Sequence, residues 1–179
     1  MNSIVLLCGG NDAGKTTTLR KFFAGCPVQR RERMNFYTRK LGNRIVYGVG
    51  DDSPQEFQQL KTKTLCDVDW VKENIKKRIR LCGVEAKGQS FILIIPYGMY
   101  ENLDRTELNE DCFLQPIEWL KTEIGFKVFP IYLRKTNATH SAKKDELARK
   151  VCLKEIDTTR DDFDKSEELE KFIIDFILT

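Results

Sequence analysis

A glycine-rich segment close to the N-terminus joins a predicted buried strand to a predicted helix. Residues 3–8 (SIVLLC) are uniformly apolar, which is typical of a strand buried on both faces of a parallel sheet. The segment GGNDAGKT (residues 9–16) follows, and its lysine begins a helix that is expected to run to Ala24. A strand, a tight loop and a helix in this order favour βαβ connections and therefore constrain the whole fold.

The remaining chain repeats this alternation of apolar strands and amphipathic helices. Strands at 35–40 and 44–49 surround Gly42-Asn43 and predict a tight hairpin. Further strands are expected at 90–95, 126–133 and 155–157, and further helices at 67–82, 111–124, 141–154 and 166–178. We therefore predict an α/β fold of three layers, with a mostly parallel sheet, helices on both faces and a small β-hairpin after the first helix. The length of 179 residues predicts one domain over residues 1–179.

Charge and hydropathy argue against several classes of protein. The chain carries 30 Lys and Arg against 27 Asp and Glu, and this near balance does not favour nucleic acid or a membrane surface as a partner. Its uncharged apolar runs are far shorter than the roughly 20 residues that a membrane-spanning helix needs. The first ten residues lack the basic start of a signal peptide.

The six cysteines form no CxxC pair and show no metal-ligand spacing. Several of them fall within apolar segments, and we therefore expect free, buried thiols in a reducing compartment. Together with the charge and hydropathy, this predicts a cytoplasmic protein that does not contact a membrane.

The residue types in segment 9–16 suit the binding of a phosphate chain. Glycines permit a tight loop whose backbone N–H groups point at phosphate oxygens, and the helix N-terminus adds its partial positive charge there. Lys15 supplies an ammonium group that can reach the β- and γ-phosphates, and the Thr16 hydroxyl is a hard oxygen ligand for Mg²⁺. Thr17 and Thr18 follow, and either can contact the α-phosphate.

This segment matches the pattern GxxxxGK[ST] in full, with a strand before it and a helix after it. Residues 3–23 thus resemble the Walker A unit of the P-loop NTPase superfamily. The resemblance implies that Mg²⁺ and ATP bind here and that Lys15 is catalytic. The nucleotide-binding residues that it implies are Gly9, Gly10, Asn11, Asp12, Ala13, Gly14, Lys15, Thr16 and Thr17.

An Asp at the end of a neighbouring strand usually completes the Mg²⁺ site of such proteins. The strand at 90–95 ends without a carboxylate, and Glu101 is the nearest acid. Asp51 and Asp52 follow another predicted strand and are the favoured acids, with Asp51 as the metal ligand. The competing interpretation is a helix cap made by Asp52 or Ser53.

Residues 51–56 (DDSPQE) also resemble the DxxGQE switch region of small GTPases. The resemblance implies that Asp51 binds the metal and that Gln55 orients an attacking water. Pro54 departs from the family, because it replaces the glycine whose N–H senses the γ-phosphate. Residues 133–137 (LRKTN) lack the Asp of the guanine-binding N/TKxD motif. We therefore expect ATP as the nucleotide and regard GTP as less favoured.

The C-terminal half resembles small P-loop kinases in its order of helix, strand, basic helix and short strand. The resemblance implies that Arg134 and Arg149 are catalytic cations and that the basic helix around Lys143 and Lys144 folds as a lid. The alternative interpretation is a helix whose basic residues are merely solvated.

Residues 20–44 form a strongly basic stretch that contains one acid, Glu32. Its candidates for binding a phosphorylated or acidic second substrate are Arg30, Arg31, Arg33, Arg39 and Arg44. The alternatives are a solvated basic face, a nucleic-acid backbone or an acidic protein partner. Tyr97 and Tyr100 follow the strand at 90–95 and are expected to contact a ligand, whereas Trp70 and Trp119 are expected to pack.

The sequence therefore predicts an Mg-ATP-binding enzyme that transfers the γ-phosphate to a small acceptor, as kinases do, or hydrolyses ATP. Two alternatives stay open. One is a nucleotide-dependent switch in which the hairpin and residues 51–57 move. The other is a module that binds nucleic acid or protein and holds a structural nucleotide.

Overall fold

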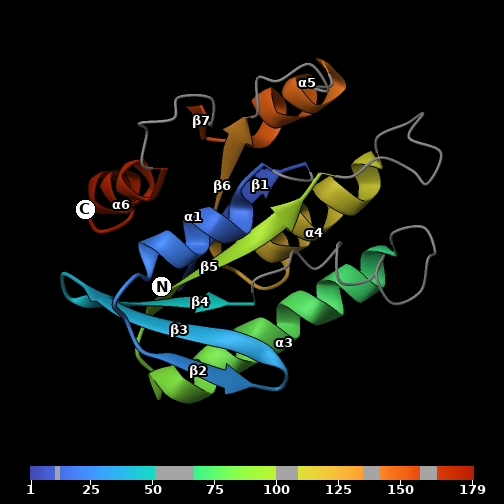
Figure 1. Cartoon of the computed structure of the whole chain (residues 1–179). Helices are drawn as coiled ribbons and strands as arrows, with labels where there is room; N and C mark the ends of the chain where they lie inside the picture. The colour runs from blue at the N-terminus through green and yellow to red at the C-terminus, as the bar shows by residue number, and fades with distance from the viewer. Residues whose placement is uncertain (11–12, 51–66, 100–108, 135–141, 158–164) are drawn as a thin grey trace.

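The computed structural model describes residues 1–10, 13–50, 67–99, 109–134, 142–157 and 165–179 (Figure 1). These residues form an α/β structure with one seven-stranded, mostly parallel sheet and five helices. The strands are β1 (Ser3–Gly9), β2 (Val28–Arg31), β3 (Met34–Leu41), β4 (Arg44–Val49), β5 (Phe91–Gly98), β6 (Lys127–Arg134) and β7 (Lys154–Asp157). The helices are α1 (Lys15–Phe22), α3 (Val68–Ala86), α4 (Glu110–Thr122), α5 (Ala142–Val151) and α6 (Lys165–Phe176).

The strand order is β2-β3-β4-β5-β1-β6-β7, which places β1 between β5 and β6. β1, β4, β5, β6 and β7 run parallel to one another, whereas β3 is antiparallel to both β2 and β4. The mostly parallel sheet and the hairpin from β3 to β4 confirm the predictions. The carboxyl ends of the five parallel strands lie along one edge of the sheet, which we call the carboxyl edge.

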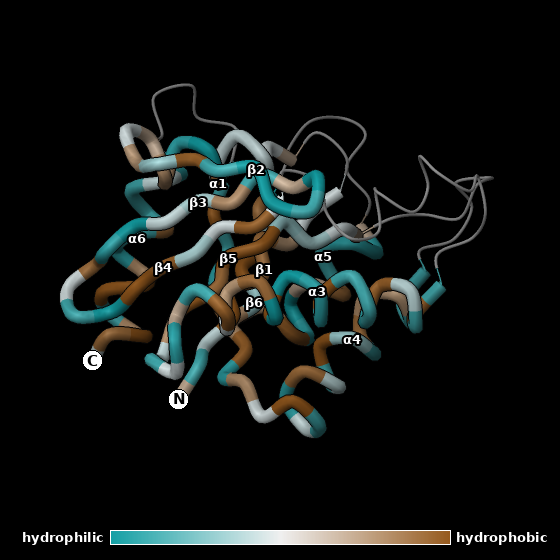
Figure 2. Tube along the Cα trace, turned by 90° about the horizontal axis from the view of Figure 1, so that it is seen from below, coloured by the Kyte–Doolittle hydropathy of each residue, from teal (hydrophilic) through white to brown (hydrophobic). Residues whose placement is uncertain are grey.

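Helices cover both faces of the sheet, as predicted. α1 and α6 pack on one face, while α3, α4 and α5 pack on the other (Figure 1). Successive side chains of β1 point to opposite faces of the sheet. Leu6 and Cys8 therefore enter one core, and Val5 and Leu7 enter the other. The central strands are apolar along their length (Figure 2), since both of their faces are covered.

The antiparallel part of the sheet is larger than the predicted hairpin. β2 adds an edge strand, and it joins β3 through a turn at Glu32 and Arg33. Both turn residues have positive φ, 47° and 67°. The sequence carries no Gly or Asn at this turn, and this is why a search for the usual turn residues misses it.

Two prolines lie inside strands that they were expected to end or interrupt. The sequence predicts that Pro96 ends one strand and that Pro130 interrupts another, but β5 and β6 continue through them. The pairing of β4 with β5 ends at Ile94, and the pairing of β7 with β6 begins at Ile131. Each proline therefore lies where its strand has a single paired neighbour, and its missing N–H is tolerated there.

The cysteines correct one expectation. Cys8, Cys26, Cys82 and Cys152 are free. Cys112 is disulfide-bonded, contrary to the expectation of free thiols, and Cys66 lies outside the described residues. None of the helices in the described ranges has the length and apolar character that a membrane span requires.

Candidate functional site

The loop between β1 and α1 needs glycine at two positions. A Cβ on Gly9 would lie 2.7 Å from the Cβ of Ala13 and 3.3 Å from the carbonyl oxygen of Leu133. Gly14 has a φ of +79°, in the left-handed region that favours glycine. The loop is therefore packed against the end of β6 and turns sharply into α1. Asn11 and Asp12 lie outside the described residues.

This loop lies at the carboxyl edge, between β1 and β6. From β1 the chain goes on to strands on one side of the sheet, and from β6 it goes on to β7 on the other side. Open parallel sheets bind their ligands where the connections diverge in this way. On the β5 side, the Met99 N–H donates to the Gly9 carbonyl oxygen at 3.0 Å, which fixes the start of the loop.

The first turn of α1 carries the residues that the motif singles out. Lys15 is 4% exposed, and its Nζ donates to the Gly10 carbonyl oxygen at 2.6 Å. Thr16 is half-buried and Thr17 is exposed. Thr18 is buried, and its Oγ1 has no hydrogen-bond partner in the described part of the chain. Thr17 is thus more accessible to a ligand than Thr18.

Two lysines from the C-terminal half reach this loop. A Cβ on Gly10 would lie 3.2 Å from the Nζ of Lys144, and a Cβ on Gly14 would lie 2.7 Å from the Nζ of Lys165. Lys144 belongs to the basic helix that the kinase resemblance singles out. Sequence reasoning missed Lys165, because the only signal was its position at the start of a helix after a strand.

Arg134 ends β6 at the carboxyl edge, beside the loop. Its guanidinium pairs with Asp145 at 3.3 Å and with Glu155 at 3.2 Å. The hydrogen bond to Glu155 and the charge of Asp145 raise the pKa of Arg134. Arg149 is exposed on α5. The structure therefore shows Arg134 holding α5 and β7 together, while a catalytic role for either arginine stays a prediction.

The residues considered for completing a Mg²⁺ site or for orienting an attacking water cannot be placed. Asp51, Asp52, Gln55 and Glu101 lie outside the described residues. The strand that precedes Asp51 is β4, and β5 separates it from β1. An acid after β4 therefore starts two strand spacings away, roughly 10 Å from the strand that bears the loop. Within the described ranges, no three acidic, His or Cys side chains form a metal-binding group.

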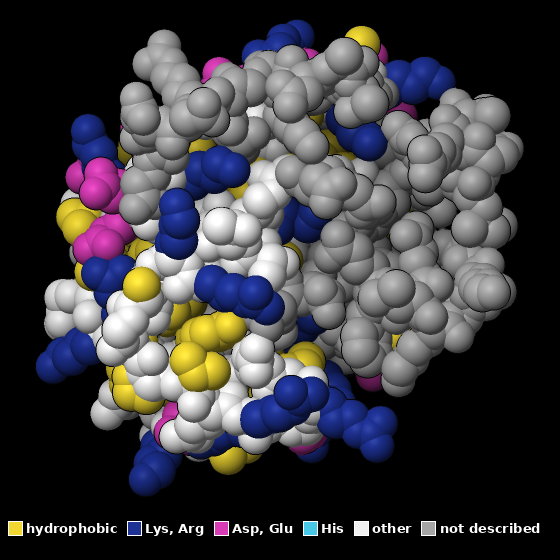
Figure 3. Space-filling model, viewed as in Figure 1, with side chains coloured by type: hydrophobic (Ala, Val, Ile, Leu, Met, Phe, Trp, Pro, Cys, Tyr) yellow, Lys and Arg dark blue, Asp and Glu magenta, His cyan; other side chains and the backbone are white. Residues whose placement is uncertain are grey.

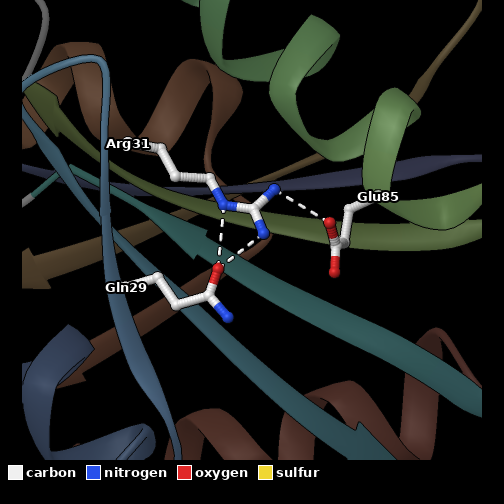
Figure 4. A network of polar contacts seen from close by, with 3 residues as sticks. All are labelled: Gln29, Arg31 and Glu85. Atoms are coloured by element: carbon white, nitrogen blue, oxygen red, sulfur yellow. Dashed lines mark hydrogen bonds and ion pairs between the residues drawn. The ribbon is translucent and has the colours of Figure 1, made fainter.

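The basic stretch at residues 20–44 does not form one face. Arg31 donates to Glu85 of α3 at 2.8 Å and to Gln29 (Figure 4). Arg39 lies on the opposite face, where it pairs with Glu170 of α6. Lys and Arg side chains are also dispersed over the face shown in Figure 3.

Arg44 lies at the opposite edge of the sheet from the loop. It begins β4 at the amino end of the parallel strands, and its Nη1 donates to the Met1 carbonyl oxygen at 3.3 Å. A single pocket lined by all five arginines, including the exposed Arg30 and Arg33, is therefore not formed.

A further expectation about a side chain is wrong. Tyr97 was expected to contact a ligand, but it is fully buried and its hydroxyl donates to the Phe113 carbonyl oxygen at 2.8 Å. Arg78 of α3 is a buried charged residue, 2% exposed, and its guanidinium packs against Gly50. Tyr100 lies outside the described residues. The two tryptophans pack against the core, as predicted.

Cys8 ends the buried part of β1 directly before the loop. Burial and a hydrogen bond with Cys152 raise the pKa of the Cys8 thiol well above its usual range, while the charge of Lys15 lowers it. The thiol is therefore protonated at neutral pH and is not a nucleophile.

No protein-family model matches this chain, and the curated proteins include no match to it. Its function therefore has to be inferred from the residues and their geometry.

Proposed function

We propose that this protein binds the phosphate chain of a nucleoside triphosphate, with Mg²⁺, at the loop between β1 and α1, and that it transfers or hydrolyses the γ-phosphate. The observation that carries the proposal is the Lys15 ammonium group, which is nearly buried inside a glycine loop at the start of a helix. A nearly buried ammonium group attracts an anion on the loop more strongly than an exposed one would, because water screens it less. The helix N-terminus favours an anion at the same place.

Each residue has a role in this proposal. Backbone N–H groups of the loop hold phosphate oxygens, and Lys15 stabilises the charge that develops as the γ-phosphate departs. The Thr16 hydroxyl would hold Mg²⁺, which neutralises charge on the phosphate oxygens when it is bound. An oxygen of water or of an acceptor attacks the γ-phosphorus, the bond to the bridging oxygen breaks, and the nucleoside diphosphate leaves. Asp51 or Asp52 is the proposed acid that completes the Mg²⁺ site.

The two other functions have less support. A switch of the GTPase type would need the glycine N–H that senses the γ-phosphate, but Pro54 replaces that glycine. A nucleic-acid- or protein-binding module would need a common basic face, but Arg31 and Arg39 lie on opposite faces of the sheet. We therefore favour the enzyme, with ATP as the expected nucleotide.

Calorimetry with Mg-ATP, Mg-GTP and Mg-ADP tests the proposal. Lys15→Met is expected to weaken Mg-ATP binding about 10- to 100-fold, the range of a hydrogen bond to a charged group. Lys21→Met removes the same charge from an exposed position of the same helix and is the matched control. No uptake of any nucleotide at millimolar concentration would refute the proposal.

Transfer and hydrolysis can then be separated with ATP labelled on the γ-phosphate. Label that moves to an added acceptor supports a kinase. Label that appears as free phosphate with every acceptor tested restricts the activity to hydrolysis.

A further inference from the structure

We propose that Lys144 of α5 and Lys165 of α6 are two further phosphate-binding cations of this site, which make it selective for a polyphosphate chain over a single phosphate. This inference rests on the proposed function and deepens it. The charge of the site identifies the ligand class as a polyphosphate, whichever base the nucleotide carries.

The side chains of Lys144 and Lys15 both reach Gly10. The Nζ, Cε and Cδ atoms of Lys144 would lie 3.2, 3.7 and 3.8 Å from a Cβ on Gly10, so the end of the side chain runs along that residue. The Lys15 Nζ is 2.6 Å from the carbonyl oxygen of the same glycine. Two ammonium groups from different helices therefore meet at the first part of the loop.

Lys165 reaches the last part of the loop. Its Nζ would lie 2.7 Å from a Cβ on Gly14, the residue that precedes α1. α6 packs beside α1 in the same layer (Figure 1), which brings the start of α6 to the start of α1. A third ammonium group is thus added where the helix N-terminus already favours negative charge.

Both lysines extend from anchored helix turns. Asp145, next to Lys144, is buried and pairs with Arg134. Burial and the nearby Asp145 carboxylate raise the pKa of the Tyr132 phenol. These contacts fix the first turn of α5 against the end of β6.

The first turn of α6 is held in a similar way. Ser166, next to Lys165, is buried. Glu168 pairs with Lys154 of β7 at 2.5 Å. The helix turns that carry Lys144 and Lys165 are therefore anchored beside the carboxyl edge of the sheet.

The positions of the three cations indicate the length of the ligand. Lys15 and Lys144 reach the loop at Gly10 and Lys165 reaches it at Gly14, and a chain of phosphates offers more oxygens and more charge to these cations than one phosphate group does. Each charge-assisted contact adds attraction, and attraction grows with the charge of the anion. The expected order of affinity is tripolyphosphate, then pyrophosphate, then orthophosphate.

Calorimetry on the full chain with these three inorganic anions tests the inference without a nucleotide. Lys144→Met and Lys165→Met are each expected to lower tripolyphosphate affinity about tenfold and orthophosphate affinity less. Lys150→Met and Lys171→Met remove the same charge from exposed positions of the same two helices. We expect the tripolyphosphate affinity of these controls to stay within about twofold of that of the original protein, because exposed charges are screened by salt.

Melting temperatures of all variants establish that each is folded. If Lys144→Met and Lys165→Met bind tripolyphosphate as their controls do, while the original protein binds Mg-ATP, the inference is wrong and the proposed function stands. If the original protein binds neither Mg-ATP nor tripolyphosphate, both are wrong.

Discussion

The first N–H groups of α1 and of α3 have no acceptor within their own helix, but only α3 has a side chain that caps them. α3 begins after Asp67, whose carboxylate accepts hydrogen bonds from the N–H groups of Asp69 and Trp70 at 2.9 and 3.4 Å. α1 begins after Gly14, which has no side chain to act as a cap, and its first turn contains no acid. The chain thus supplies its own anion to α3, whereas α1 has neither a side-chain cap nor an acid in its first turn.

A helix without a cap is common, and the absence of a cap alone does not make a binding site. The difference between α1 and α3 becomes informative because Lys15, Lys144 and Lys165 lie around the start of α1. Local charge therefore decides how an uncapped helix end should be interpreted. The following changes test whether the two ends differ in function as they differ in structure.

The largest effect is expected when the loop before α1 receives a side chain. Gly9→Ala places a Cβ 2.7 Å from that of Ala13, and the resulting overpacking should lower the free energy of unfolding by about 1–3 kcal/mol. Phosphate binding should be lost, since the loop must shift. Chemical denaturation and calorimetry measure the two effects.

Gly83→Ala in α3 is the matched control, because nothing lies within 4 Å of the added Cβ. It should raise the free energy of unfolding by about 0.5–1 kcal/mol through helix propensity. Equal stability of the two variants would show that the loop is not tightly packed.

The next effect is expected when α1 is given an internal anion like that of α3. Thr17→Glu places a carboxylate in the first turn at an exposed position and should stabilise the protein by about 0.3–1 kcal/mol. The same charge should weaken Mg-ATP binding by about tenfold, or ~1.4 kcal/mol, through like-charge repulsion. Thr17→Gln keeps the size without the charge, and tighter Mg-ATP binding by the Glu variant would contradict the comparison.

A smaller effect is expected when the cap of α3 is removed. Asp67→Ala should lower the free energy of unfolding by about 1 kcal/mol, because two N–H groups lose their acceptor. Nucleotide affinity should not change, whereas Asp67→Asn should retain most of the stability. Thermal melts and calorimetry provide the readouts, and a loss of nucleotide binding in Asp67→Ala would show that the two helix ends are coupled.

The smallest effect is expected from the basic residues that pair with acids away from the loop. Arg31→Met removes an exposed ion pair with Glu85 and should change stability by at most about 1 kcal/mol. Mg-ATP affinity should match that of Arg30→Met, an exposed neighbour without such a pair in the described contacts. A selective loss of affinity in Arg31→Met would instead favour a second anion site near β2.

The elements with strong local signals could be predicted from the sequence. The parallel strands, the hairpin at Gly42 and the loop before α1 follow from apolar runs, glycines and periodicity. β2 could not be predicted in this way, since its turn uses Glu32 and Arg33 at positive φ. Pro96 also misled, because a proline is compatible with a strand wherever a paired neighbour is missing.

In the candidate site, too, some residues could be predicted from the sequence and others could not. Lys15 and Thr16 could be found because the loop motif is continuous in sequence. Tyr97 was misjudged because spacing along the chain does not reveal which layer covers a side chain. Burial depends on packing between elements that are distant in sequence.

By itself, the sequence determined a glycine loop between a buried strand and a helix, because backbone conformation there depends on neighbouring residues and on glycine's freedom at positive φ. The tertiary structure alone decided that β5 separates β4 from β1 and that α5 and α6 bring Lys144 and Lys165 to the loop. Strand order and helix docking minimise exposed apolar surface over the whole chain, and no local pattern encodes that balance.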